Sequence, residues 1–165
     1  YYVLAAVVVV DPVAVASTLR RLIAERRNVV HWTSEGPVMR SRLIDTICEF
    51  AVATTVRWSP TGRRGQLDAR SRLLTQIGTW AHSEGVEHLV VEASDETINR
   101  RDRQTLACHP LTSAGGLGFR YDHRSKREPL LWLADAVAGI AGEHLVGKGS
   151  APYERLVSAG LLPQP

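Results

Sequence analysis

The sequence predicts an α/β fold in a single domain of residues 1–165. Apolar, β-branched segments alternate along almost the whole chain with amphipathic segments of helical period, and this order is typical of proteins with at least partly parallel strands. The length of 165 residues, with 44% hydrophobic and 22% charged residues, suits one globular domain and excludes wholesale disorder. No internal repeat and no long linker divides the sequence.

Five segments are predicted to be strands. The first, residues 1–10, is apolar at almost every position, as expected for a strand that is covered on both faces. The other four are short apolar segments or alternate apolar and polar residues; they are residues 29–32, 50–58, 87–93 and 119–122. We therefore expect a mixed sheet of about five strands.

Six helices are predicted between and after these strands. The first begins after Asp11, because an aspartate caps a helix and the following Pro12 suits its first turn. It ends at Asn28, and the other five helices are residues 38–47, 66–83, 99–107, 129–145 and 152–159. We expect these helices to cover the faces of the sheet.

Composition also limits where the protein works. The longest apolar runs, residues 1–10 and 129–141, are shorter than the ~20 residues of a membrane-spanning helix, so no membrane partner is expected. The first run lacks the basic segment and cleavage site of a secretory signal, and because it opens without methionine we expect a further segment upstream. Cys48 and Cys108 can form one bridge, but two free thiols in a reducing cytoplasm are the simpler interpretation.

The basic residues are almost all arginine. Of the 20 lysine and arginine residues, only Lys126 and Lys148 are lysine, and the net charge is +3. The compositional bias of a GC-rich genome explains this first. Phosphate binding explains it second, because the arginine fork holds phosphate through two hydrogen bonds.

Asp135 is the most informative residue for function. It lies in the apolar run 130–141, and a helix that is apolar all round is buried. An ionised carboxylate there is costly unless it is paired, hydrogen-bonded or bound to a metal. We expect a largely buried carboxylate that either binds a metal or takes part in catalysis, or else pairs with an arginine.

Glu92 is the second candidate, because it ends an apolar strand, where parallel-sheet proteins place their active groups. Asp95 and Asp102 follow closely. Asp95 assists catalysis in this hypothesis, or simply caps the next helix, where acids favour the macrodipole. Asp102 stands between two arginines and either acts in catalysis or belongs to a solvated, charged face.

His31 and Glu35 flank a predicted turn, and a histidine there can bind a metal, accept a proton or merely close a loop. No His-Glu-x-x-His, paired Cys-x-x-Cys or Gly-x-Ser-x-Gly motif occurs, so a zinc hydrolase and the common serine-hydrolase turn are unsupported.

Five arginines near Glu92 and Asp135 in sequence form the predicted nucleic-acid-binding set: Arg100, Arg101, Arg103, Arg124 and Arg127. Carboxylates around hard cations beside arginines suit phosphodiester cleavage, because Mg²⁺ bridges carboxylate and phosphate while arginine holds the strand. The alternative is that arginine-rich surfaces simply follow from this composition.

Several of these segments together resemble the domain-of-unknown-function 3800 family. They are the opening strand, the His31-Trp32 turn, the strand ending in Glu92 and the segment Leu131-Trp132-Leu133-Ala134-Asp135-Ala136-Val137-Ala138-Gly139. The resemblance covers nearly the whole chain, and its most specific part is the helix around Asp135. That family is similar in fold to ribonuclease H, whose nucleases hold Mg²⁺ or Mn²⁺ with acids on the first strand, the fourth strand and the last helix.

The resemblance implies a ribonuclease-H-like sheet in which Glu92 and Asp135 ligate Mg²⁺ or Mn²⁺ and His31 or Asp95 assists. The family's first-strand acid belongs to an Asp-Glu-Ser sequence just before the strand that opens this chain, and this sequence is not present here. The leading hypothesis is a metal-dependent nuclease or nucleic-acid-processing domain. The alternative is a non-catalytic binding or assembly domain that retains the fold without the first acid.

Overall fold

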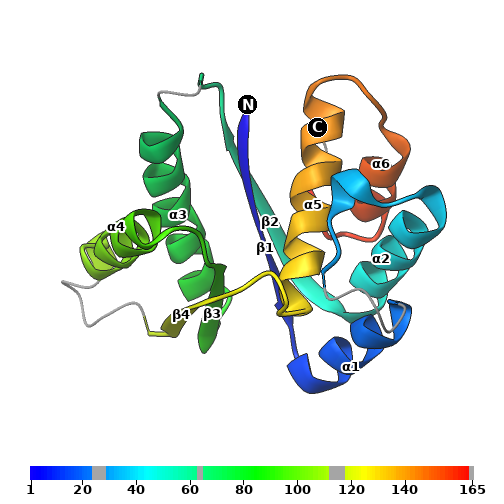
Figure 1. Ribbon diagram of the computed structural model, residues 1–165, viewed down its shortest axis with the longest axis horizontal. Coiled ribbons are helices and arrows are strands. Elements are labelled where there is room, and N and C mark those ends of the chain that lie inside the picture. Colours follow the sequence, from blue (N-terminus) through cyan, green and yellow to red (C-terminus); the bar gives the residue numbers. More distant parts are fainter. Residues whose placement is uncertain (24–28, 63–64, 112–117, 164–165) are drawn as a thin grey trace. The chain divides into compact units, whose positions relative to one another are not determined.

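The computed structural model describes residues 1–23, 29–62, 65–111 and 118–163. These residues form two compact units. The first unit contains residues 1–4 and 57–125, and the second contains residues 5–56 and 126–165. The elements that Figure 1 labels follow one another along the chain as an alternation of strands and helices.

Two strands contribute residues to both units. They are β1 (Tyr2–Val9) and β2 (Ala51–Ser59), which pair in an antiparallel two-stranded sheet. Both agree closely with the predicted strands 1–10 and 50–58. β2 follows α2 (Pro37–Phe50) without any connecting residue.

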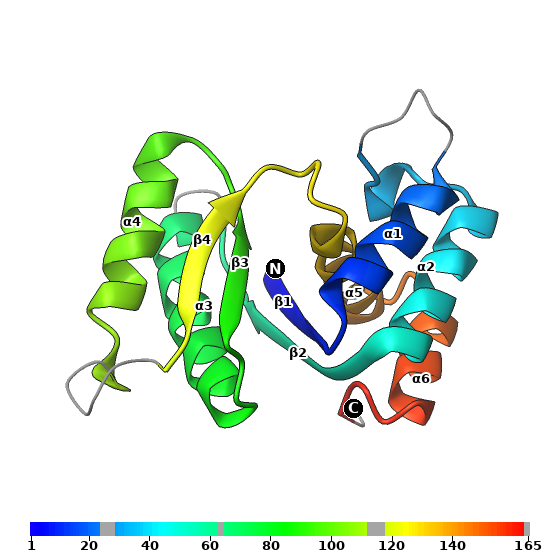
Figure 2. The ribbon, with the colours of Figure 1, turned by 90° about the horizontal axis from the view of Figure 1, so that it is seen from below.

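The first unit also contains a parallel two-stranded sheet with two helices. β3 (His88–Glu92) pairs with β4 (Arg120–Arg124), with Glu92 opposite Arg124, and the two strands lie side by side in Figure 2. α3 (Gln66–Ser83) packs against α4 (Glu96–Ala107). Leu74 and Leu106 are the buried centre of a small apolar cluster in this unit, and partly buried hydrophobic side chains pack around them: Leu4, Leu89, Leu111, Phe119 and Tyr121.

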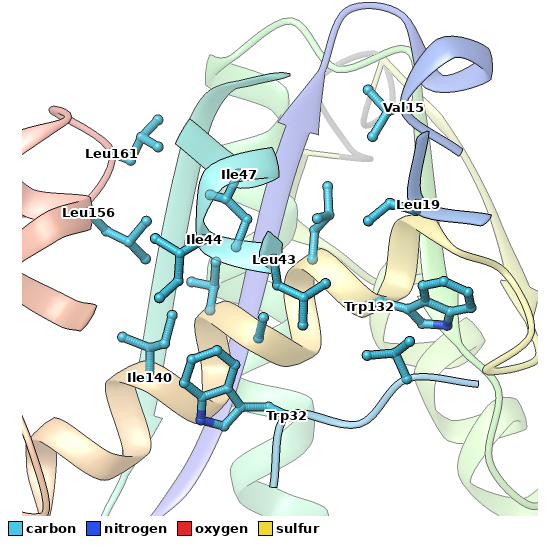
Figure 3. Packing of buried hydrophobic residues seen from close by; sticks show 14 of the residues in the cluster. Val15, Leu19, Trp32, Leu43, Ile44, Ile47, Trp132, Ile140, Leu156 and Leu161 are labelled. Atoms are coloured by element: carbon cyan, nitrogen blue, oxygen red, sulfur yellow. The ribbon is translucent and has the colours of Figure 1, made fainter. Parts of the chain in front are cut away.

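The second unit contains the larger core. Its helices are α1 (Pro12–Leu22), the short 3-10 helix η1 (Trp32–Ser34), α2, α5 (Leu130–Leu145) and α6 (Ala151–Ser158). Figure 3 shows Trp32 from η1 and Ile140 from α5 close together beneath α2. The apolar face of α1 supplies Val15 and Leu19 to the same core.

Local sequence explains where several helices begin. Asp11 caps α1 by accepting a hydrogen bond from the Ala14 backbone N–H at 2.9 Å, and Pro12 occupies the first helical position. Asp95 caps α4 in the same way through the Ile98 N–H, which is why α4 begins at Glu96 rather than at the predicted residue 99. None of the described helices combines the length and the hydrophobicity needed to span a bilayer.

The predicted ribonuclease-H-like sheet of about five strands is wrong. The described residues contain two sheets of two strands each, one antiparallel and one parallel. The predicted strand 29–32 is missing from both sheets, because Trp32 begins η1 and its backbone N–H bonds to a side chain instead of a neighbouring strand. The mixed α/β composition stands, but its strands do not join into one five-stranded sheet.

Candidate functional site

Asp135 lies on α5, which buries Trp132, Leu133, Ala136 and Val137 around it. The Asp135 side chain remains 28% exposed, so the expectation of a largely buried carboxylate is wrong in degree. Its Oδ2 accepts a hydrogen bond from the backbone N–H of Trp32 at 2.8 Å. The carboxylate therefore anchors the segment before η1 onto α5, across 103 residues of sequence.

His31 lies beside this carboxylate. Its Nδ1 is 3.4 Å from Asp135 Oδ2, and its side chain is 39% exposed. Its other ring nitrogen, Nε2, lies 2.7 Å from Nζ of Lys126. A lysine ammonium can only donate, so Nε2 is the acceptor in this contact, and the tautomer that matches it carries its proton on Nδ1, the nitrogen that faces Asp135. We call His31, Asp135 and Lys126 the dyad–lysine cluster; all three belong to the second unit.

Trp32 fixes the backbone that carries His31. Its side chain is 1% exposed and lies against Gly139 of α5. The Arg40 guanidinium stacks over the indole, 4.6 Å from its centroid, and Arg40 Nε donates to the Trp32 carbonyl at 3.0 Å. Arg40 also pairs with Glu143 of α5 at 3.1 Å. The segment that carries His31 is thus held by contacts with α5 and with Arg40 of α2.

Lys126 is positioned by a second tryptophan. The indole N–H of Trp132, from the first turn of α5, donates to the Lys126 carbonyl at 2.8 Å. Trp132 is itself in the core. Sequence reasoning placed Lys126 among the basic residues but not in the site. The sequence held one indication that Lys126 has a specific role, because it is one of only two lysines in an arginine-rich chain.

The structure therefore brings together two of the predicted catalytic residues, His31 and Asp135. The alternative in which an arginine pairs with Asp135 is wrong for the described residues, where its partners are a backbone N–H and a histidine. Glu92 and Asp95 lie in the first unit, so their pairing with Asp135 stays a prediction. Asp95 has the capping role that was the alternative to catalysis.

The predicted metal ligands, Glu92 and Asp135, belong to different units. No three His, Cys, Asp or Glu side chains among the described residues are grouped so that they could hold one ion. Asp135 Oδ2 is already engaged by the Trp32 N–H. The Mg²⁺ or Mn²⁺ site of Glu92 and Asp135 stays a prediction.

Three of the five predicted nucleic-acid-binding arginines are paired with carboxylates. Arg101 pairs with Asp68 and Arg103 with Glu96. Arg124 pairs with Asp122 at 2.9 Å, and its hydrogen bond is the main reason that the pKa of Asp122 lies below its usual value. These exposed pairs are weak and can exchange for phosphate, but they reduce the positive charge of the surface.

The other two predicted arginines are placed differently. Arg100 is exposed on α4, in the first unit, while Arg127 belongs to the second unit just before α5. The prediction of one continuous patch therefore stays untested.

Asp102 has a buried structural role. It is 1% exposed, and Arg70 Nη2 pairs with its Oδ2 at 2.7 Å, so the prediction of a solvated charged face is wrong. Nε2 of His123 lies 3.3 Å from the same oxygen. Although desolvation by burial acts in the opposite direction, hydrogen bonds to Asp102 and Tyr2 raise the pKa of Arg70 above its usual value. A buried arginine–carboxylate pair accounts for this residue without catalysis.

Histidine–aspartate contacts are not rare in this chain, so the contact alone does not define a site. His88 Nε2 lies 3.5 Å from Asp122, with exposure much like that of His31 and Asp135. The dyad–lysine cluster differs in two respects: a lysine faces the second imidazole nitrogen, and the carboxylate oxygen also holds a backbone N–H from a distant segment.

No family model, curated protein or solved structure matches this chain. The resemblance seen in the sequence therefore stays an expectation.

Proposed function

We propose that the chain is a nucleic-acid-processing domain that acts on phosphodiester bonds at the dyad–lysine cluster. The observation that carries the proposal is the pair of contacts on His31, with Asp135 at Nδ1 and Lys126 at Nε2. A neutral imidazole oriented by a carboxylate is suited to accept a proton from an attacking hydroxyl. A lysine ammonium at the same point is suited to a phosphate oxygen.

The chemical step requires these groups, the substrate and an attacking hydroxyl, which is the neighbouring 2′-hydroxyl in RNA or a water molecule in either nucleic acid. When a phosphodiester enters, the Lys126 ammonium turns to a phosphate oxygen, which leaves His31 Nε2 available. The attacking hydroxyl gives its proton to Nε2 as its oxygen bonds to phosphorus, and the bond from phosphorus to the leaving oxygen breaks. The leaving oxygen takes this proton from His31, which returns the imidazole to its neutral form. Asp135 stabilises the imidazolium and holds its orientation, which makes it a positioning residue.

Cleavage of fluorescently labelled single-stranded RNA and DNA, in EDTA and in Mn²⁺, tests this proposal. We expect His31→Gln to lower kcat by about 100-fold or more, the usual contribution of a general base. Asp135→Asn should lower kcat more than it raises KM, whereas Lys126→Met should mainly raise KM. Cleavage that requires Mn²⁺ and vanishes in Glu92→Gln would favour the predicted metal site instead.

The matched control is His88→Gln, which removes a histidine–aspartate contact of similar distance and exposure that lacks a lysine on its other nitrogen. It should leave cleavage unchanged. Equal loss in both histidine variants, or no cleavage by the wild type on either substrate, contradicts the proposal.

A non-catalytic binding domain is the second candidate. The observation in its favour is that Asp135 already has a structural task, because it accepts the Trp32 N–H that holds η1 against α5. In that case the dyad–lysine cluster binds a phosphate without cleaving it. Oligonucleotide binding that weakens in Lys126→Met, without product in any condition, would decide for this candidate.

A further inference from the structure

An exposed aromatic pair lies at one end of the β1–β2 ribbon, in the first unit. Trp58, near the end of β2, is 48% exposed, and Tyr1 is 60% exposed. Their rings meet edge to face, with centroids 5.2 Å apart and an interplanar angle of 88°. Edge-to-face packing is one of the preferred arrangements of two aromatic rings, and about half of the Trp58 surface remains open to solvent. Neither ring takes part in the dyad–lysine cluster.

An arginine reaches the same strand end. Arg72, exposed on α3, donates from Nη2 to the Ser59 hydroxyl at 3.3 Å, and Ser59 directly follows Trp58. Among the described residues Arg72 has no carboxylate partner, unlike Arg101, Arg103 and Arg124. Its positive charge is therefore not cancelled locally, and an anionic ligand would complement it.

We infer that Trp58 and Arg72 form a binding platform for single-stranded nucleic acid. An unpaired base stacks on the Trp58 indole, which is in contact with Tyr1, and a phosphate further along the same oligonucleotide binds the Arg72 guanidinium at the end of β2. Because adjacent side chains of a strand point to opposite faces, the base and the phosphate would lie on opposite faces of β2 at this end. The inference deepens the proposed function and rests on it, since it names single strands as the substrate class.

Single strands fit this surface better than the alternatives do. Every base offers a flat face to an aromatic ring once it is unstacked, whereas the bases of a duplex are stacked inside it. A protein partner would have to cover aromatic rings beside Arg72, which has no carboxylate partner among the described residues, so an acidic side chain would be needed at that point. The net charge of +3 favours a polyanion.

The test measures binding of a short fluorescein-labelled oligothymidylate and of a duplex by anisotropy, at several salt concentrations. Trp58→Ala should weaken single-strand binding by about 5- to 150-fold, the loss of one stacked base. Trp58→Phe keeps an aromatic face and should retain most of the affinity, but it should abolish the oligonucleotide-dependent quenching of tryptophan fluorescence. Arg72→Gln should lower the slope of log K against log salt by ~0.7.

The control variants are Val13→Ala and Arg20→Gln on α1, which remove an exposed apolar side chain and an exposed arginine from the second unit. Both should bind like the wild type. The inference is overturned if Trp58→Ala binds single strands as tightly as the wild type, or if it loses duplex affinity equally. It is also overturned if the only effect of Trp58→Ala is to abolish self-association seen by light scattering.

Failure of this inference and failure of the proposed function give different results. If the oligonucleotide quenches Trp58 and binds but is not cleaved, the platform stands and the catalytic proposal falls. If the wild type cleaves single strands and Trp58→Ala does so with unchanged KM, the platform falls and the catalytic proposal stands. If single strands do not bind at low salt, both fall.

Discussion

Gly139 on α5 is the position where one added methyl group should do the most damage to the candidate site. A Cβ built there would lie 2.5 Å from Cγ and 3.0 Å from Cβ of Trp32. A rotamer change cannot remove the contact with Trp32 Cβ, which moves only with the backbone. That backbone is held by the hydrogen bond from the Trp32 N–H to Asp135, so the strain cannot relax cheaply.

Two opposing contributions set the magnitude for Gly139→Ala. Replacing a helical glycine with alanine normally stabilises by about 1 kcal/mol. Overpacking a filled core costs about 1–3 kcal/mol, and the anchored backbone places this case near the upper end. We therefore expect the free energy of unfolding to fall by about 2 kcal/mol, measured by urea denaturation.

Gly142→Ala, one turn further along α5, is the matched control. A Cβ at Gly142 meets nothing within 4 Å, so the helix-propensity contribution acts alone and the variant should gain about 0.5–1 kcal/mol. The two substitutions should therefore have opposite signs in one helix. If Gly139→Ala is as stable as the wild type or more stable, the close packing of Trp32 against α5 is refuted.

Five further substitutions test single contacts, each by urea denaturation in EDTA. Asp135→Asn keeps an oxygen for the Trp32 N–H, so it should change the free energy of unfolding by less than about 1 kcal/mol. Asp135→Ala leaves that donor without a partner and should cost about 1–3 kcal/mol. Equal losses in the two variants would contradict the role of this hydrogen bond. Asp102→Ala strands a buried guanidinium and should cost about 3–5 kcal/mol, while Asp68→Ala, in an exposed pair, should cost under about 1 kcal/mol. The arginine-bonded Asp122 has a pKa below its usual value, so its contribution is present above the unfolded pKa of about 3.9 and is lost as pH falls through the folded pKa. Asp122→Asn should thus be slightly less stable than the wild type at neutral pH, by under about 1 kcal/mol because the pair is exposed. This difference in stability should vanish in acid. A difference that grows on acidification would refute the lowered pKa of Asp122.

Local features of the sequence predicted most elements, because their causes lie within a few residues. Asp11 with Pro12 located the start of α1, and the apolar run 130–141 located α5. Residues 29–32 were misassigned because Val29 and Val30 favour a strand in any local count. Their conformation is instead decided by the packing of Trp32 against Gly139, and these two residues are far apart in the sequence.

The pairing of strands was the part that sequence could not supply. An apolar, alternating segment shows that a strand exists but does not name its neighbour, and the predicted sheet relied on a family resemblance for its order. The site divides in the same way. Asp135 could be singled out from the sequence because an ionised carboxylate in an apolar segment is energetically costly, and its presence there points to a specific role. The meeting of Asp135 with His31 depends on tertiary packing across about a hundred residues.

The direct passage from Phe50 at the end of α2 to Ala51 at the start of β2 makes this junction intolerant of changes in chain length. A loop absorbs an added residue by bulging into solvent, but here there is none to absorb it. One inserted residue would either rotate the last turn of α2, which buries Ile47, or shift β2 by one position and exchange its two faces. The second outcome would expose Thr55, now buried, and turn Val52 inward. Related chains should therefore differ in length at their turns, and keep the spacing between Ile47 and Thr55 unchanged.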